Sequence, residues 1–507
     1  MNSLTRIPSR LLLLCADQLR ADALRCYGNA VVDTPHIDRL ASSGRRFAHH
    51  YTVAVPCGPS RASLLTGLYP LTHRIVHNRT PFDPNIPNIA SILNSASVSA
   101  YLIGYTDTAA APFLNEADAE GVMPGFSVYA HFNLNDHGLR PWVRTLESRG
   151  YGPFDNPFDV FGSGSGEAAS FKERRRSIYD VSESDTAFLA DQTIACIAEH
   201  RDEPWLIHTA FLRPHGPLVA PAPYDSQYSG SAMPPPVRAA TRLAERELHP
   251  FLANSIDHLD LEWTAETDVA VGLASAEMLA EIRSVYLGLV AELDYHVGRI
   301  IAALESFDLM DTTSIVFTSD HGDLLGDHWL FGSRGFFDAA YHVPLIITTP
   351  KSRNAIRELG PVDGFTESVD IVPTILDLMG LPPMEWTDGH SLMPFLYQAN
   401  PRWTRNATFW EYDFRNACSG ELERVGVPST ECALNVWRTK SHKYVHFTAL
   451  PPLLFDLDSD PEELVDRVRE PKYRDVLLKC TGDLLSHRIK HADQRRANLA
   501  PLARPVV

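Results

Sequence analysis

Two apolar runs, far apart in the sequence, each end in a carboxylate. LLLLCADQ at residues 11–18 closes on Asp17, and SIVFTSDHGD at residues 314–323 carries Asp320 with His321 directly after it. Such runs are typical of strands that are buried on both faces of a sheet. Because the carboxyl ends of parallel strands meet at one edge of a sheet, we expect Asp17 and Asp320 to converge. Two carboxylates and an imidazole suit a divalent cation, although each carboxylate taken singly could equally cap a helix.

A cysteine stands where a helix is expected to begin. The stretch VPCGPSRASLLTGLYP at residues 55–70 has Pro59 as a candidate first helical residue and Gly67 as a candidate stop. Cys57 therefore lies at a helix N-terminus, where free backbone N–H groups and the helix dipole favour an anion, either a thiolate or a bound oxyanion. Arg61, one turn later, adds a positive charge. The alternative is a buried cysteine with a purely structural role.

The segments around these residues predict a large α/β unit followed by a smaller sheet. Helical patterns such as TPHIDRLASSG at residues 34–44 and the long segment 278–306 alternate with the apolar runs, which favours a mainly parallel sheet flanked by helices. Past about residue 400, the segments TFWEYDFR, LNVWRTK and KYVHFTAL are rich in aromatic and β-branched residues and predict a small antiparallel sheet. We therefore expect one domain over residues 1–400 and a smaller C-terminal domain over residues 401–507.

Composition and charge exclude several classes of protein. The chain has 507 residues, 44% of them hydrophobic and 21% charged, which is typical of a globular enzyme. Its formal charge of −18 argues against a nucleic-acid partner, because phosphate backbones bind basic surfaces. The apolar run at residues 11–14 is too short for a signal peptide or a membrane span, so we expect a cytoplasmic protein without a membrane partner. Seven cysteines without C-x-x-C spacing fit neither a disulfide framework nor a zinc site.

Several of these motifs together resemble one enzyme family. C-x-P-S-R followed by A-S-L-L-T-G resembles the signature of the type I sulfatases in the alkaline phosphatase superfamily. VDTPHIDRLASSG, FTSDHGDLLGDH and FTESVDIVPTILDLMG resemble further segments of that family in the same order along the chain. RPHGPLVAPAPY at residues 213–224 and KYVHFTALPPLLFDLDSDPEE resemble the phosphonate monoester hydrolases and their arylsulfatase relatives. The resemblance implies the sulfatase fold, with its large mainly parallel sheet and smaller C-terminal antiparallel sheet.

The resemblance also implies a modified cysteine and a metal ion. In this family a separate formylglycine-generating enzyme oxidises the signature cysteine, here Cys57, to a formylglycine aldehyde. One divalent metal ion is implied, with Mn²⁺ favoured over Ca²⁺ because the branch carries a histidine at the position of His321. Gln18 would contribute to the ligand shell or border it. The implied ligand set is Asp17, Gln18, Cys57, Asp320 and His321.

The family mechanism assigns roles to further residues. A hydroxyl of the hydrated aldehyde attacks phosphorus or sulfur, while the metal and Arg61 neutralise the non-bridging oxygens. His215, in RPHGP, matches the histidine that protonates the leaving group, although it could also be a loop histidine bonded to the backbone. Asn78 and Tyr105 match substrate-contacting positions of the phosphonate hydrolase branch; the alternatives are a turn residue and a core aromatic residue.

Two positions depart from the pattern of the branch. Asp107 stands where the branch has a small hydroxyl residue, and Ser333 stands where it has a lysine. An acidic side chain beside an anionic substrate weakens binding, and the missing lysine removes a positive charge. Arg334 is the nearest candidate for a compensating charge, so we expect it to pair with Asp107 in the substrate site. Otherwise Asp107 repels the anion or receives a cationic group of the substrate.

The function expected from the sequence is a metal-dependent, formylglycine-using hydrolase. Its substrates would be small anionic esters, namely sulfate esters, phosphonate monoesters or phosphodiesters. Two alternatives stay open: a phosphatase-like hydrolase with unmodified Cys57, and a non-catalytic binding protein on the same fold. The branch often forms tetramers through its C-terminal segment, so we expect a homo-oligomer, a tetramer or a dimer, with the tail at residues 491–507 as an arm or as a frayed terminus.

Overall fold

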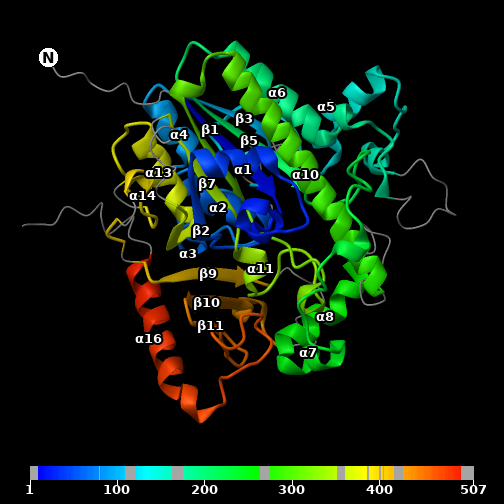
Figure 1. Ribbon diagram of the computed structural model, residues 1–507. Coiled ribbons are helices and arrows are strands. Elements are labelled where there is room, and N and C mark those ends of the chain that lie inside the picture. Colours follow the sequence, from blue (N-terminus) through cyan, green and yellow to red (C-terminus); the bar gives the residue numbers. More distant parts are fainter. Residues whose placement is uncertain are drawn as a thin grey trace, which may run out of the picture.

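The computed structural model describes residues 10–78, 80–108, 122–162, 175–262, 275–350, 360–384, 387–398, 401–403, 405–415 and 426–492. The chain forms a large eight-stranded sheet with helices on both faces and a smaller four-stranded sheet beside it (Figure 1). The large sheet has the strand order β4-β3-β5-β1-β6-β7-β2-β8. These strands are β1 (Arg10–Asp17), β2 (Arg45–Tyr51), β3 (Ser99–Gly104), β4 (Ser127–His131), β5 (Trp205–Pro214), β6 (Thr313–Ser319), β7 (Leu345–Thr348) and β8 (Val362–Glu367).

The large sheet is mostly parallel, which confirms the fold class expected from the sequence. β1 lies at the centre, parallel to β5 on one side and to β6 on the other. Only β7 runs antiparallel to its neighbours, β6 and β2. Ala16 of β1 pairs with Ser319 of β6, so the residues that follow these two positions leave the sheet at the same edge.

Both faces of the large sheet are covered, which explains why β1 is apolar at nearly every position. Leu12 and Leu14 pack into the core on one face, while Leu11 and Leu13 pack into the core on the other. The first face carries α1 (Pro35–Ser43), α5 (Asp136–Ser148), α6 (Asp185–Glu199) and α10 (Ala276–Ser306). The second carries α2 (Cys57–Thr66), α4 (Ile89–Ser95), α13 (Ile371–Leu378) and α14 (Met393–Tyr397).

Helix α2 begins two residues earlier than the sequence predicted. Pro56 is the N-cap and Cys57 is the first helical residue, so Pro59 stands inside the first turn rather than at its start. A proline is tolerated there because the N–H groups of a first turn have no intrahelical partner. Gly67 ends the helix as predicted, with φ of 72° and its N–H 2.9 Å from the Ser63 carbonyl. All ten residues of α2 are buried.

The predicted C-terminal sheet is present and has four antiparallel strands. They are β9 (Ala407–Asp413), β10 (Ala433–Thr439), β11 (His442–Phe447) and β12 (Leu453–Asp456), in the order β12-β11-β10-β9. Helix α16 (Arg474–Lys490) packs on β10 and β11. Trp410 of β9 stacks between Tyr51 and Tyr341 of the larger unit. The domain boundary at residue 400 stays a prediction, and residues 493–507 of the expected arm lie outside the described residues.

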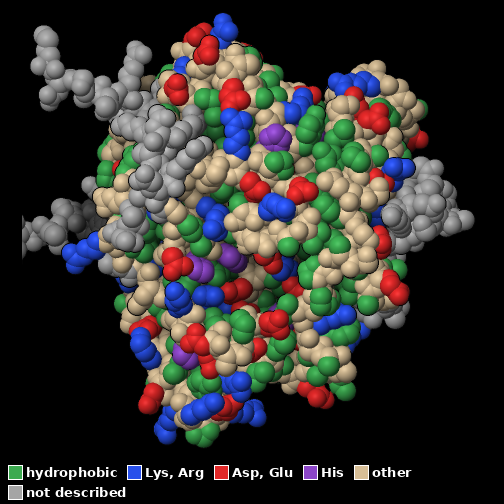
Figure 2. All heavy atoms as spheres, in the orientation of Figure 1, with side chains coloured by type: hydrophobic (Ala, Val, Ile, Leu, Met, Phe, Trp, Pro, Cys, Tyr) green, Lys and Arg blue, Asp and Glu red, His purple; other side chains and the backbone are tan. Residues whose placement is uncertain are grey.

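The remaining described α-helices are shorter or peripheral: α3 (Pro70–His73), α7 (Arg242–Leu248), α8 (Pro250–Glu262) and α11 (Asp338–Tyr341). Across the described ranges, no helix is both long enough and apolar enough to span a bilayer. The six described cysteines carry free thiols, and Cys418 lies outside the described residues. Figure 2 shows acidic and basic side chains interspersed over the face seen in Figure 1, so the net negative charge does not form one patch on that face.

Candidate active site

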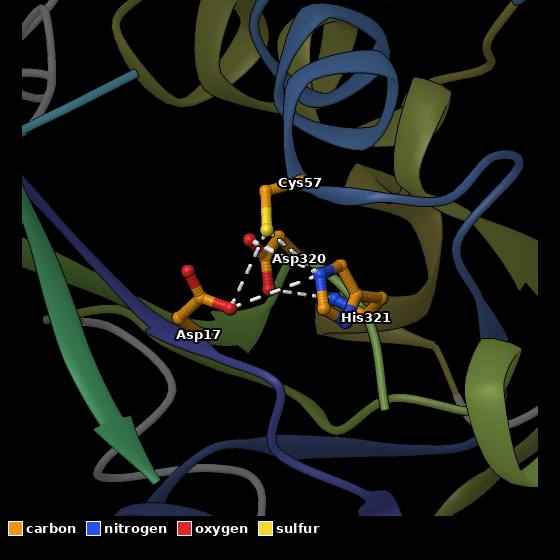
Figure 3. Close-up of side chains that lie close together, drawn as sticks. All are labelled: Asp17, Cys57, Asp320 and His321. Atoms are coloured by element: carbon orange, nitrogen blue, oxygen red, sulfur yellow. Dashed lines mark hydrogen bonds and ion pairs between the residues drawn. The ribbon is translucent and has the colours of Figure 1, made fainter. Parts of the chain in front are cut away.

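The two predicted strand-end carboxylates, the histidine and the cysteine meet in one buried group (Figure 3). Asp17 ends β1, Asp320 and His321 directly follow β6, and Cys57 begins α2. One ligand atom from each of the four lies within 4.8 Å of those of the others. The Cys57 Sγ atom is 3.1 Å from His321 Nε2 and 3.8 Å from Asp17 Oδ1, and His321 Nε2 is 3.7 Å from Asp17 Oδ1. The convergence predicted from the two apolar runs is confirmed.

The ring of His321 is oriented as a metal-binding imidazole requires. Its Nδ1 atom is 2.9 Å from the Gly322 carbonyl, which can only accept, so Nδ1 carries a proton and Nε2 is the ring nitrogen that faces the group. Asp320 is held by two main-chain donors, because its Oδ1 accepts from the N–H of His321 at 2.8 Å and from that of Gln18 at 3.1 Å. The donor set of two carboxylates, an imidazole and residue 57 fits a divalent metal ion.

Arg61 lies behind the two carboxylates and is fully buried. Its Nε atom donates to Asp320 Oδ2 at 2.9 Å, Nη2 to Asp17 Oδ2 at 3.0 Å, and Nη1 to the Tyr105 carbonyl at 2.8 Å. We expected this guanidinium to contact the substrate, but these contacts turn it toward the protein. Its geometry supports a role in orienting Asp17 and Asp320, whose charges it balances.

Tyr105 and Gln18 also contact the group rather than open space. The buried Tyr105 hydroxyl donates to Asp17 Oδ2, and its ring lies 3.9 Å below the Arg61 guanidinium. The side-chain amide of Gln18 donates to Asp323, and its main chain has φ of 68°. Gln18 therefore borders the four-residue group, with its amide nitrogen already bonded to Asp323.

His215 lies at the end of β5, next to Asp17. Its main-chain N–H donates to the Asp17 carbonyl at 3.2 Å, and its Nδ1 atom lies 2.7 Å from the Gly216 carbonyl. Burial alone would raise the pKa of Asp17, but the charges of His215, Arg61 and His321 outweigh it and lower that pKa. The predicted acid is therefore next to the cluster, and its ring is half-buried.

The environment of Cys57 suppresses the thiolate, which corrects the expectation drawn from its place at a helix start. Burial raises the pKa of the thiol well above its usual value, and Asp17, Asp320 and Asp107 raise it further, while Arg61 only partly offsets them. The helix start also has few donors left. Gly58 N–H already donates to Asn78 Oδ1 at 2.8 Å, and Pro59 has no N–H.

The two loops that carry Asn78 and Asp107 close over the start of α2. A Cβ atom at Gly58 would lie 3.0 Å from the Asp107 carbonyl oxygen and 3.1 Å from Asn78 Cα, so a larger residue there would push against both loops. Asn78 is exposed and caps the first turn of the helix through its side-chain oxygen. Its observed contact is thus structural, whereas we had expected a contact with substrate.

Asp107 is close enough to the active site for the charges there to act on its carboxylate, but the cations involved differ from the one expected. Burial raises its pKa to about 6, Asp17 and Asp320 raise it, and Arg61 and His215 lower it. The principal cations that act on Asp107 are therefore Arg61 and His215 rather than Arg334, which corrects the pairing we inferred from sequence proximity. Arg334 and Ser333 are half-buried on the segment after β6.

Sequence reasoning missed the buried residues that hold these groups in place. Asp323 accepts from the side chain of Gln18 and, through Oδ1, from the N–H groups of Leu325 and Gly332 at 2.8 Å each. Tyr286 of α10 donates to the Gln18 carbonyl at 2.8 Å. The signal for Asp323 was its place three residues after Asp320 in the same motif; the sequence held no such signal for Tyr286.

Comparisons with known proteins agree with this geometry. The Sulfatase family model matches residues 9–381, and a model described as N-sulphoglucosamine sulphohydrolase, C-terminal, matches residues 326–490. The multifunctional alkaline phosphatase superfamily protein PehA of Trinickia caryophylli is 35% identical over 501 residues, which is 96% of each chain. The choline-sulfatase of Rhizobium meliloti is 27% identical over 91% of this chain and 83% of its own length.

Two solved structures are similar over nearly the whole chain. The phosphonate monoester hydrolase of Agrobacterium radiobacter is 39% identical, with a TM-score of 0.90 over 96% of this chain and 97% of that one. The phosphonate monoester hydrolase SpPMH from Silicibacter pomeroyi is 34% identical, with a TM-score of 0.87 over 96% of each chain.

Proposed function

This chain belongs to the sulfatase family and is a sulfatase-family ester hydrolase. We propose that it cleaves phosphonate monoesters, phosphodiesters and sulfate esters with a formylglycine at position 57. One observation carries the proposal: Asp17, Cys57, Asp320 and His321 form a buried group of potential ligands with His215 beside it. The two phosphonate monoester hydrolases, at 39% and 34% identity, favour phosphonate monoesters as the first substrates to test.

A divalent metal ion fits this group. Asp17, Asp320, His321 and residue 57 would hold it, with Gln18 at the border of the shell. A metal bound there would act as a Lewis acid on the non-bridging oxygens of the ester. The imidazole of His321 favours Mn²⁺ over Ca²⁺, because Ca²⁺ prefers oxygen ligands alone.

Residue 57 serves this function better as an aldehyde than as a thiol. Without a bound cation, burial and three carboxylates raise the pKa of the thiol, so unmodified Cys57 offers little nucleophilic thiolate in the metal-free site. The hydrate of a formylglycine, produced from Cys57 by a formylglycine-generating enzyme, supplies an oxygen nucleophile at the same place. Together with the match to the sulfatase family, this supports the modified enzyme over a phosphatase-like hydrolase with an unmodified cysteine.

His215 is the general acid in this proposal. Its Nδ1 atom donates to the Gly216 carbonyl, so the proton given to the leaving group would leave from Nε2 of the imidazolium. Arg61 and Tyr105 orient Asp17 from the protein side. We place Asp107 at the edge of the substrate pocket, because its charge acts on residue 57 and on His215. Asn78 and Tyr105 keep their proposed substrate contacts by resemblance to the family, and Arg334 keeps its own as the nearest candidate for the charge of the lysine that Ser333 replaces.

Two measurements test the proposal. The peptide that contains residue 57, taken from protein co-expressed with a formylglycine-generating enzyme, should show the mass of the aldehyde, and Cys57→Ala should fold without turnover. Rates on matched nitrophenyl sulfate, nitrophenyl phenylphosphonate and a nitrophenyl phosphodiester should then rank the substrate classes. A thiol mass together with full turnover would remove the formylglycine from the mechanism.

The role of His215 is tested by varying the leaving group. A general acid contributes roughly 10²–10⁴-fold, and most of this where the leaving group is poor. His215→Ala should therefore lower kcat/KM far more for alkyl esters than for nitrophenyl esters. Equal losses on both esters would exclude protonation of the leaving group by His215.

A further inference from the structure

A buried ion pair stands next to the loop that carries His215. Arg213 belongs to β5, all ten residues of which are buried, and Asp185 is the first residue of α6. Arg213 is 0% exposed and Asp185 is 1% exposed. The Arg213 Nε atom lies 2.9 Å from Asp185 Oδ2 and 3.1 Å from Oδ1.

The other side of the same guanidinium binds the main chain of the His215 loop. Arg213 Nη1 donates to the carbonyl of His215 at 3.2 Å and to that of Pro217 at 2.5 Å. One charged group thus bridges the carbonyls of residues 215 and 217. The N–H of His215 donates to the Asp17 carbonyl at 3.2 Å and to the Leu212 carbonyl at 3.0 Å. The backbone of His215 is therefore fixed between a residue of the metal-binding group and the Arg213 guanidinium.

Asp185 is itself held in place by the start of α6. Ser184 is the N-cap of this helix, and its hydroxyl accepts from the Ala187 N–H at 3.0 Å. A carboxylate in the first turn is favoured by the positive end of the helix dipole. The helix start thus keeps a negative charge at the point where Arg213 needs its counter-charge.

We infer that Arg213 is a positioning residue for His215 and that Asp185 fixes its guanidinium. The inference rests on the proposed role of His215 as general acid. Arginine can bind one carboxylate and two carbonyls at once because its donors form a rigid planar fork, whereas a lysine offers a single point charge. An ion pair with only a structural role is a weak explanation, because replacing a buried ion pair by apolar residues is often neutral for stability or stabilising.

Arg213→Lys is the main test, because it keeps the charge but removes the fork. Kinetics on the fully modified, metal-loaded enzyme should show kcat/KM falling about 10- to 100-fold on alkyl esters, since a displacement near 1 Å costs about 10²-fold. The loss on nitrophenyl esters should stay below about threefold, since good leaving groups need little protonation. The double variant Arg213→Lys/His215→Ala should be no slower than His215→Ala alone, because both changes remove one function.

Two further variants separate positioning from a general loss of folding. Asp185→Asn keeps the shape of the side chain and removes the counter-charge, so it should show the same selective loss on alkyl esters. This variant provides the test if Arg213→Lys does not fold. Glu292→Gln is the matched control. Glu292 lies on α10, is 0% exposed, and is close enough for Asp185 and Arg213 to act on its charge. Its substitution should leave the ratio of alkyl to nitrophenyl rates unchanged.

The outcomes distinguish this inference from the proposed function. If His215→Ala is selective for alkyl esters while Arg213→Lys and Asp185→Asn lower both rates equally, the positioning role is wrong and the acid role stands. Multiplicative losses in the double variant would lead to the same conclusion. If His215→Ala itself lowers both rates equally, the acid role fails, and the positioning role fails with it.

Discussion

Replacing Arg61 with methionine should make the stability of this protein depend strongly on metal. Arg61 is the guanidinium that the structure places between Asp17 and Asp320, with contacts of 3.0 Å and 2.9 Å. Side-chain exposure of all three residues is 1% or less. Arg61→Met leaves two buried carboxylates without the guanidinium that contacts both of them, and in the metal-free protein the histidines His215 and His321 still act on Asp17.

The size of the effect follows from this burial. Removing one partner of a buried ion pair costs about 3–5 kcal/mol, because the remaining charge stays buried without compensation. We expect the free energy of unfolding of metal-free Arg61→Met to fall by that amount. A bound divalent cation would compensate the same carboxylates, so Mn²⁺ should restore much of the loss and should stabilise the variant more than the wild type.

Urea unfolding of both proteins, in chelator and in excess Mn²⁺, measures this difference. Arg405→Met is a matched control, because Arg405 also joins two buried carboxylates, Asp370 and Glu367, at a site away from the metal-binding group. Its loss of stability should be the same with and without metal. If Arg61→Met loses less than about 1 kcal/mol in chelator, or if Mn²⁺ stabilises it no more than the wild type, the assignment of Arg61 as the counter-charge is wrong.

Three further outcomes are expected. Asp320→Asn should lose bound metal and turnover together, as measured by elemental analysis and kcat; full metal content and full activity would exclude Asp320 as a ligand. Asp107→Thr should raise kcat/KM for simple anionic esters, because it removes a negative charge that repels them. The principal cations acting on Asp107 are Arg61 and His215, so the effects of Asp107→Thr and Arg334→Ala on kcat/KM should be additive in the double variant. Burial raises the pKa of Glu292 to about 8 in the folded protein, above its value of 4.5 in the unfolded chain. Between these two pH values the unfolded chain loses this proton while the folded protein keeps it, so the free energy of unfolding falls as the pH rises. The stability of Glu292→Gln relative to wild type should therefore rise by about 4 kcal/mol between pH 4.5 and pH 8 in urea unfolding, and a difference independent of pH would contradict it.

The sequence predicted the centre of the site because local patterns determine it. An apolar run ending in a carboxylate indicates a strand buried on both faces, and two such runs in a parallel sheet must end at the same edge. The structure bears this out, since Ala16 and Ser319 are paired and Asp17 and Asp320 follow them. The start of α2 was misplaced by two residues because proline is favoured at the first helical position, yet is also tolerated deeper in the first turn.

The residues around the centre could not be predicted, because their partners are distant in sequence. Asp107 and Arg334 were paired on the charges that the sequence offered, whereas the fold brings Asp107 under the influence of Arg61 and His215. Arg213 could be read from the sequence only as the first residue of the RPHGP motif that contains His215. Its contact with Asp185 depends on how α6 packs beside β5, and no periodicity in either segment encodes that contact.

Whether the Cys57 thiol ionises at this helix start depends on the balance between the helix dipole, the nearby carboxylates and Arg61. A helix N-terminus stabilises an anion by about 0.3–1 kcal/mol, or about 2 kcal/mol in a partly buried site. One carboxylate at the observed 3.8 Å from Sγ opposes a thiolate by about 4 kcal/mol at an effective dielectric constant near 20. Asp320 and Asp107 add to this, and Gly58 N–H is already bonded to Asn78. Arg61 cannot reverse the balance, because the two carboxylates already share its charge. A thiol at position 57 therefore stays protonated unless a further cation binds, so chemistry at this helix start depends on that cation or on a different functional group at residue 57.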